Sequence, residues 1–299
     1  MYDPAFPIAY YYSWQAVSDA MIPNVMAEFR ENGAENLVMS HIWLDRILRD
    51  MKFWSVLLRH ARRQHVNLVE AHAPWGQGYD LCCPERARRP GMIEDHKRAM
   101  NYCADTGCRT YTMHVGAYES VFYHTPNEVL RPFVLDSLEQ LLPEAEKLGI
   151  VIAVENSYER SNTPEEVAAC IEHFDSPFIG CCLDVGHAHL MEPFPGKRRE
   201  LYFDEMDAAW GERVEEYSGA LERLAPHIVT CHLHDNDGYS DAHRLPGEGT
   251  IDWRELIRKL KALPRLVSMQ TEVRTVPTAL PVAKLVRTFG TLLETAEAK

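Results

Sequence analysis

Short apolar runs rich in valine and isoleucine alternate along the chain with longer segments whose apolar residues recur at helical spacing. The runs are typical of strands buried in a parallel sheet, and the longer segments are typical of helices that cover it. The expected strands are 6–12, 36–41, 66–72, 110–114, 150–155, 178–184, 228–234 and 266–272. The expected helices are 18–31, 45–64, 92–106, 126–148, one that begins after an N-cap at Thr163, one that reaches about residue 224, 253–263 and 280–298.

Eight strand–helix units in 299 residues predict a closed (β/α)8 TIM barrel, formed by residues 1–299 as a single domain. A doubly wound open sheet is the alternative, although it requires no such regular count of units. No linker, internal repeat or low-complexity segment interrupts the pattern.

The composition narrows the class of protein. With 46% hydrophobic and 25% charged residues, the chain has an ordinary globular composition, and no apolar stretch is long enough to span a membrane. The net charge of -13 argues against a broad surface for nucleic acid or anionic lipid. The start of the chain does not resemble a secretory signal, and the eight cysteines include no CxxC. We therefore expect reduced thiols and a cytoplasmic location.

Histidine is unusually frequent, with 14 residues against seven lysines. In a TIM barrel the functional groups lie at the carboxyl ends of the strands, and seven of the eight expected strands end in His, Asp or Glu. Convergent carboxylates repel one another unless a cation neutralises them, so the pattern predicts a divalent metal site. The residues at or just beyond these strand ends are His41, His72, His114, Glu155, Asp184, His187, His232, His234, Asp241, His243 and Glu272.

The spacing of these residues gives some of them more weight than others. Asp184 and His187 flank a glycine turn, which lets both side chains face one ion. His232 and His234 lie on the same face of a strand, so one of them is expected to bind metal. The other is expected either to contact substrate or to support the metal ligands from behind. Such ligands accept Mn, Mg, Co or Zn and do not choose among them.

Other histidines and several aromatic residues are expected to have structural roles. A lone histidine is usually structural, and we expect this role for His41, His60, His65 and His173. Four aromatic residues near the ends of the first and third strands are candidates for stacking on a sugar: Tyr10, Tyr12, Trp14 and Trp75. For any single one of them, ordinary packing is the stronger interpretation.

The sequence lacks the motifs of several other enzyme classes. The lysines fall in expected helices, a surface loop or the terminus, which argues against a Schiff-base aldolase. Neither GxGxxG nor a P-loop is present, and the short segment 246–249 is better read as a turn than as a phosphate cradle.

Three segments resemble the xylose-isomerase-like TIM-barrel superfamily, which holds sugar isomerases, epimerases and endonuclease IV. They are Leu183-Asp-Val-Gly-His187, His232-Leu-His-Asp-Asn236 and Leu245-Pro-Gly-Glu-Gly-Thr-Ile-Asp-Trp253, and the resemblance runs from Ala71-His-Ala-Pro74 to the last strand. The resemblance implies one divalent metal held by Glu155, Asp184, His232 (or His234) and Glu272, with His187 in contact with substrate.

The endonuclease IV branch implies a larger metal set of up to three zinc ions. The additional positions in this chain are His72, His114, Asp241 and His243, with His187 as a further ligand. The residues leave the metal count open, with one ion favoured and up to three allowed.

The favoured hypothesis is a metal-dependent sugar isomerase or epimerase, in which Glu155 and Glu272 move a proton at carbon. One alternative is endonuclease IV-like hydrolysis of DNA, favoured by the additional ligands and by the basic run 86–89 but opposed by the net charge. Another is a lyase on an oxidised glycoside that uses the same site. The expected partner is a small sugar, and the resemblance implies a homo-oligomer.

Overall fold

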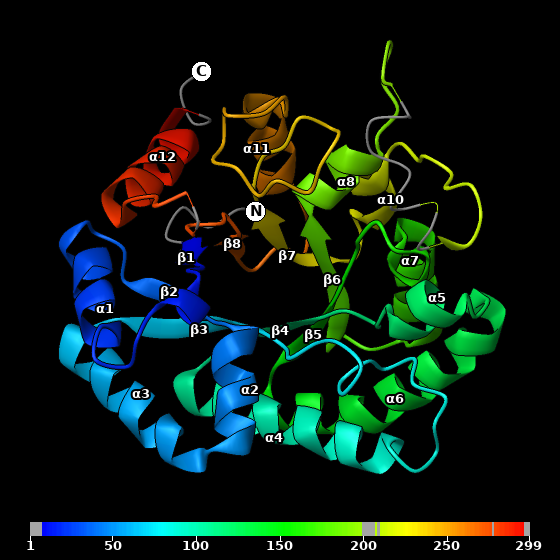
Figure 1. Cartoon of the computed structure of the whole chain (residues 1–299), viewed down its shortest axis with the longest axis horizontal. Coiled ribbons are helices and arrows are strands. Elements are labelled where there is room, and N and C mark those ends of the chain that lie inside the picture. The colour runs from blue at the N-terminus through cyan, green and yellow to red at the C-terminus, as the bar shows by residue number, and fades with distance from the viewer. Residues whose placement is uncertain (1–7, 199–206, 208–209, 277, 296–299) are drawn as a thin grey trace.

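Eight parallel strands close into a barrel in the computed structural model, which describes residues 8–198, 207, 210–276 and 278–295 (Figure 1). The strands follow the order of the chain around the barrel, and β1 pairs with β8 to close it. The prediction of a TIM barrel is confirmed. The strands are β1 (Ile8–Tyr10), β2 (Asn36–Met39), β3 (Asn67–His72), β4 (Thr110–Met113), β5 (Val151–Glu155), β6 (Ile179–Asp184), β7 (Ile228–Leu233) and β8 (Met269–Thr271).

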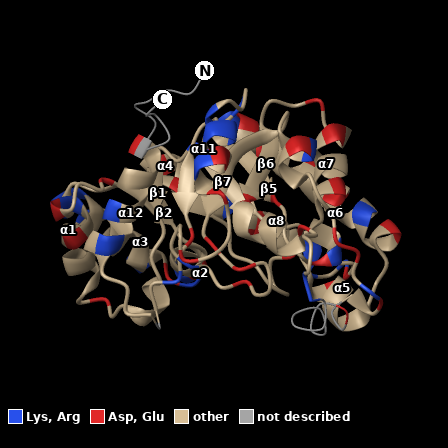
Figure 2. Ribbon diagram, turned by 90° about the horizontal axis from the view of Figure 1, so that it is seen from above, with Lys and Arg blue, Asp and Glu red and all other residues tan. Residues whose placement is uncertain are grey.

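Helices surround the barrel, and Figure 2 shows Lys, Arg, Asp and Glu positions along these helices. The apolar core lies between strands and helices and includes Leu37, Tyr111 and Phe289, which are fully buried. No helix of the described residues is both long and apolar enough to cross a membrane. The helices are α1 (Ile22–Glu31), α2 (His41–Arg49), α3 (Met51–Gln64), α4 (Arg89–Thr106), α5 (Tyr118–Tyr123), α6 (Asn127–Leu148), α7 (Pro164–His173), α8 (Val185–Met191), α10 (Ala220–Leu224), α11 (Trp253–Lys261) and α12 (Val282–Thr295), with short 3₁₀ turns at η1 (Trp14–Ala16) and η2 (Arg160–Asn162).

The helix expected over 45–64 is in fact two helices that meet at Asp50. The backbone of Asp50 is extended, with φ −138° and ψ 91°, and its carboxylate accepts a hydrogen bond from Lys52 N at 3.1 Å. Asp50 therefore ends α2 and caps α3. The N-cap position of Thr163 is confirmed, although its hydroxyl makes no capping hydrogen bond. The last expected helix ends in residues 296–298, which lie outside the described part of the chain.

Hydroxyl and amide groups fill the barrel beneath its carboxyl end. Gln270 on β8 reaches Thr112 on β4 and Thr230 on β7, at 3.5 and 3.3 Å. Deeper in the barrel, Glu70 accepts a hydrogen bond from Thr110. Since these side chains are almost completely buried and bond to one another, they form a polar floor under the strand ends.

Candidate metal centre and cavity

The carboxyl ends of the strands open into a cavity of about 680 Å³. Residues from loops distant in the sequence meet there, as barrel closure requires. Asp184, His232 and His234 do not line the cavity but are completely buried at the strand ends, in contact with residues that do. The other sequence-predicted site residues all line it: His72, Trp75, His114, Glu155, His187, Asp241, His243 and Glu272.

The first group of candidate ligands is formed by Glu155, Asp184, His232 and Glu272, which end or follow β5 to β8. One ligand atom from each lies within 4.8 Å of the others. His232 Nδ1 is the common contact, at 2.9 Å from Glu155 Oε1, 3.1 Å from Glu272 Oε2 and 3.8 Å from Asp184 Oδ2. A single ring proton cannot satisfy three carboxylates, whereas a divalent cation can be shared by all of them.

Glu155 also faces two histidines from neighbouring strands. Its Oε2 lies 3.3 Å from His72 Nε2 and 3.4 Å from His114 Nε2. His72, Glu155 and His232 form a further group with ligand spacing. Glu155 therefore lies between two sets of imidazoles and could bridge two ions.

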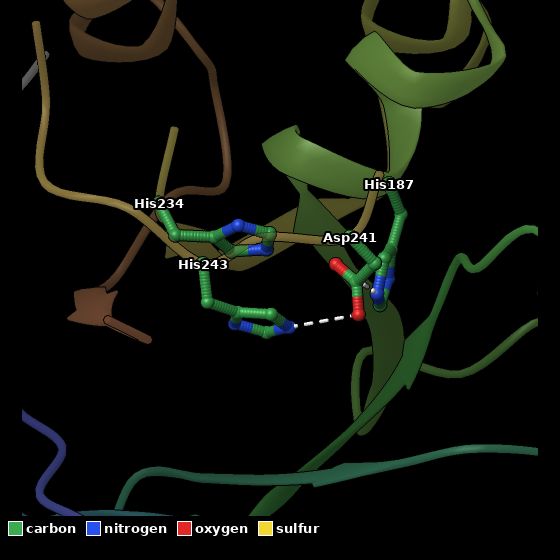
Figure 3. A group of neighbouring side chains, drawn as sticks. All are labelled: His187, His234, Asp241 and His243. Carbon is green, nitrogen blue, oxygen red and sulfur yellow. Dashed lines mark hydrogen bonds and ion pairs between the residues drawn. The ribbon is translucent and has the colours of Figure 1, made fainter. Parts of the chain in front are cut away.

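The second major group contains His187, His234, Asp241 and His243 (Figure 3). His243 Nε2 lies 3.1 Å from Asp241 Oδ2, and His187 Nε2 lies 3.5 Å from Asp241 Oδ1. His234 Nε2 contacts Asp184 Oδ1 at 3.0 Å, which joins this group to the first. The structure thus gives the two histidines of β7 and its carboxyl end different neighbours: His232 belongs to the first group and His234 to the second.

The orientation of three histidines fits a metal. The Nδ1 atoms of His72, His187 and His243 lie 2.8, 3.2 and 2.6 Å from the backbone carbonyls of Ala73, Asn156 and Glu272. A carbonyl only accepts hydrogen bonds, so each Nδ1 carries the proton. In the neutral ring the Nε2 lone pair then faces a carboxylate, which is the arrangement that a bound cation stabilises.

Unpartnered ligand atoms support the same conclusion. Among the described residues, seven buried side-chain atoms have no hydrogen-bond partner, and four of the seven are Glu155 Oε2, His234 Nδ1, Asp241 Oδ1 and Glu272 Oε2. Buried polar atoms of this kind are rare because each one loses its hydration without compensation. All four belong to the ligand groups, so the donor set fits divalent metal ions.

The electrostatics of the cluster keep Glu155 ionised. Burial raises the pKa of Glu155, but the adjacent His232 and His114 outweigh it and hold the pKa well below the ordinary value. Burial lowers the pKa of His232, yet Cys182, Glu155 and Glu272 together raise it well above the ordinary range. Glu155 is therefore already in the charge state that metal binding requires, whereas His232 must release a proton to become a ligand.

Local sequence explains how Asp184 and His187 are placed. Asp184 ends β6 and caps α8, because its Oδ1 accepts a hydrogen bond from His187 N at 2.7 Å. Its backbone N and O are held by the amide of Asn156, at 2.9 and 3.1 Å. A Cβ at Gly186 would overlap the His234 ring, so the glycine of this segment is required by the close approach of β7.

Two residues line the cavity although the sequence did not identify them as site residues. His41, expected to be structural, lies in the cavity wall beside His72, with ring centroids 5.5 Å apart. Burial, with a smaller contribution from His72, lowers the pKa of His41 to about 3, so this ring is neutral. Tyr11 also lines the cavity, while its neighbours Tyr10 and Tyr12 pack on Phe29 of α1. The alternation of strand side chains was the signal that could have identified Tyr11.

Comparison with known proteins gives a family and several relatives. The family described as xylose isomerase-like TIM barrel matches residues 44–287. Fructoselysine 3-epimerase from Escherichia coli O157:H7 is 26% identical over 186 residues, which cover 62% of this chain and 60% of the relative. The chain spans between 50% and 62% of the length of the curated relatives that it matches first.

Solved structures share the fold. A D-tagatose 3-epimerase-like protein superimposes with a TM-score of 0.71 at 19% identity, covering 97% of this chain and all of the other. A xylose isomerase-like TIM barrel protein from Mycobacterium smegmatis, solved with magnesium, gives 0.72 at 15% identity, covering 100% of both chains. At these identities the likeness shows the fold alone.

Proposed function

The chain belongs to the xylose isomerase-like TIM barrel family, and from this membership and the geometry of its cavity we propose that it is a metal-dependent sugar epimerase or isomerase. The observation that carries the proposal is the pairing of Glu155 and Glu272. They come from opposite ends of the ligand series, on β5 and after β8, yet both line the cavity and both contact His232 Nδ1. The epimerase relative supports the same class of substrate.

The proposed metal ligands are Glu155, Asp184, His232 and Glu272. A divalent cation held there would polarise a sugar carbonyl and stabilise the negative charge that develops when the neighbouring carbon loses its proton. We further propose that His187, Asp241 and His243 hold a second ion, with His234 beside them and His72 and His114 available next to Glu155.

The carboxylates are the candidate bases. One of Glu155 and Glu272 removes the proton from carbon, and the other returns a proton. Return to the opposite face of the carbon inverts it, which is epimerisation; transfer along one face converts an aldose into a ketose. With the first ion alone bound, His187 would hold a sugar hydroxyl, and Trp75 offers a ring on which a sugar could stack. His234 is completely buried, does not line the cavity and contacts Asp184 and His243, so we do not assign it to the sugar.

Metal analysis and proton exchange test this proposal. We expect the purified protein to hold divalent metal. We also expect it to catalyse the incorporation of deuterium from solvent into a ketose, which mass spectrometry measures. Glu155→Gln and Glu272→Gln should each abolish exchange, whereas Glu159→Gln, which lies in the same cavity but in no ligand group, should retain it. Metal-loaded protein that exchanges no proton with any tested ketose or aldose would contradict the proposal.

Phosphodiester hydrolysis is a second candidate, favoured by the additional ligands His72, His114, Asp241 and His243. The cavity argues against it, because among the described residues that line it Arg274 is the one Lys or Arg. A site for a DNA backbone usually offers several cations to the phosphates. Nicking of abasic duplex DNA by the metal-loaded protein would favour this candidate. The lyase alternative has a different product, because a lyase acting on an oxidised glycoside would release the aglycone.

A further inference from the structure

The cavity has two chemically different halves. At the strand ends it is lined by histidines and carboxylates, and at the mouth by Trp75, Phe122 and Val276. These three side chains are 57%, 65% and 41% exposed, and they are three of the seven large hydrophobic side chains that the described residues expose. Exposed apolar side chains gathered at one site are typical of a binding surface.

Trp75 connects the two halves. Its ring centroid lies 5.8 Å from that of His41 and 6.4 Å from that of His114. His114 in turn contacts Glu155. A ligand held at the strand ends would therefore extend directly onto the Trp75 ring as it leaves the site.

The buried carboxylate of Asp80 fixes the relative position of Trp75 and Phe122. It accepts hydrogen bonds from Gly76 N at 3.1 Å, in the loop that carries Trp75. It also accepts from Tyr118 N at 2.9 Å, at the start of α5, and the Tyr118 ring packs on Phe122 with centroids 4.7 Å apart. The segments that carry Trp75 and Phe122 are thus tied to one anchor before any ligand arrives, which lowers the cost of ordering this part of the apolar wall on binding.

The size of the cavity is that of a site for a drug-sized ligand. A free monosaccharide carries hydroxyls around its ring and would leave the outer wall in water. We propose that the substrate is a sugar that bears an uncharged aromatic or alkyl substituent, and that this substituent lies against Trp75, Phe122 and Val276. The sugar part of this inference rests on the proposed function, whereas the outer subsite rests on the apolar wall alone.

Binding of paired ligands tests the subsite without turnover. Isothermal calorimetry would compare phenyl and methyl β-glucosides, and phenyl and methyl fructosides, on the metal-loaded protein. We expect the phenyl member of at least one pair to bind about tenfold more tightly. Phe122→Ala and Trp75→Ala should remove most of this preference, with thermal unfolding used to show that both variants fold.

Tyr123→Ala is the matched control, because Tyr123 follows Phe122 on α5, is 63% exposed and does not line the cavity. It should retain the preference. Equal binding of phenyl and methyl members in every pair, including no binding at all, would overturn the inference. So would an equal effect of Phe122→Ala and Tyr123→Ala, or a change of oligomeric mass in Phe122→Ala with ligand preference intact. Preferential phenyl binding without proton exchange would contradict the proposed function and leave the subsite in place.

Discussion

The imidazole of His243 stacks on that of His234, with ring centroids 3.8 Å apart and planes inclined by 10°. The two rings come from different segments, the end of β7 and the loop beyond it. His243 is held in this position by Glu272 O at 2.6 Å and by an unusual backbone with φ 46°. The stack fixes where the Nε2 atom of His243 points, which is toward Asp241.

The first prediction concerns His243→Asn. Asparagine tolerates a positive φ better than most residues, so the variant removes the ring with little added backbone strain. We expect the metal content per chain to fall by one ion, with the ion held by Asp184 and His232 retained. Elemental analysis of dialysed protein measures this, and His173→Asn, on an exposed part of α7, should change nothing. An unchanged metal content in His243→Asn would contradict the second ion.

The second prediction concerns Gly186→Ala. A Cβ here would overlap the His234 ring, so the ring or the helix must shift, at a cost of about 1–3 kcal/mol in unfolding free energy. Urea unfolding measures it. Gly290→Ala is the control, since a Cβ at this helical glycine has nothing within 4 Å; it should stabilise the protein by about 0.5–1 kcal/mol. Equal stability of Gly186→Ala and the parent would show that His234 moves freely.

The third prediction concerns Asp235, a completely buried carboxylate. It accepts hydrogen bonds from Gly247 N and Trp253 Nε1, each at 2.8 Å, and from Ile251 N at 3.3 Å. Asp235→Ala leaves these donors without their acceptor and should lower the unfolding free energy by about 3 kcal/mol or more. Asp237→Ala removes an ion pair with Arg244 that is partly exposed, and we expect a loss below about 1 kcal/mol. Comparable losses in the two variants would contradict the role of Asp235.

The fourth prediction is a pH dependence of stability through His96. Its Nε2 donates to Tyr79 O at 2.8 Å and its Nδ1 accepts from the Tyr111 hydroxyl at 3.0 Å, so the folded protein holds the neutral ring. Burial lowers the pKa of His96 below its ordinary value of 6.5. Because the unfolded chain gains a proton below that value and the folded chain does not, stability is present above it and is lost as the pH falls.

The expected loss through His96 reaches up to about 1.4 kcal/mol for each pH unit below the ordinary pKa. Chemical unfolding at about pH 7.5 and about pH 5 measures it. His96→Gln should be less stable at the higher pH but should lose less on acidification. The exposed His173 provides the control, since His173→Gln should show the parent's pH dependence. The interpretation is wrong if His96→Gln and the parent lose stability in parallel.

The fifth prediction concerns metal removal. An ion that binds only the folded chain stabilises it, by about 3–4 kcal/mol at a free concentration of 100 to 1,000 times its dissociation constant. Chelation should therefore lower the melting temperature of the parent. Asp184→Asn should respond to the chelator less than the parent does, because only the second ion proposed at His187, Asp241 and His243 would remain to be removed. Glu159→Gln should respond as the parent does. A melting temperature that is insensitive to chelator in the parent would contradict tight metal binding.

Much of the fold could be predicted because each buried strand leaves an apolar run in the sequence. The helix break at Asp50 was missed because apolar periodicity continues through it, although Asp is a common N-cap. The six-residue helix α5 is too short to show a period. Local pattern is therefore a good guide to long elements and a poor guide to where one ends.

The candidate site was predictable to the extent that it consists of strand ends. The rule that functional groups end strands selects Glu155 and Asp184, but the same rule does not distinguish His41 from a structural histidine at a strand end. What the sequence could not give is the partner of each group. That Asp235 holds the loop before α11, and that His234 rather than His232 joins the second ligand group, depends on contacts between distant segments.

The pairing of β1 with β8 has a consequence for folding. Tyr11 N donates to Thr271 Oγ1 at 3.1 Å across 260 residues of chain, and Glu272 is the next residue. Such long-range closure is slow, because the chain loses its entropy before the contacts form. Glu272 does not depend on this closure, because its backbone N donates to Leu233 O at 3.1 Å at the end of β7, next to His232. The pairing of β7 with β8 therefore brings the last acidic ligand of the first group into place, and we expect the ligand group to form before β1 closes the barrel.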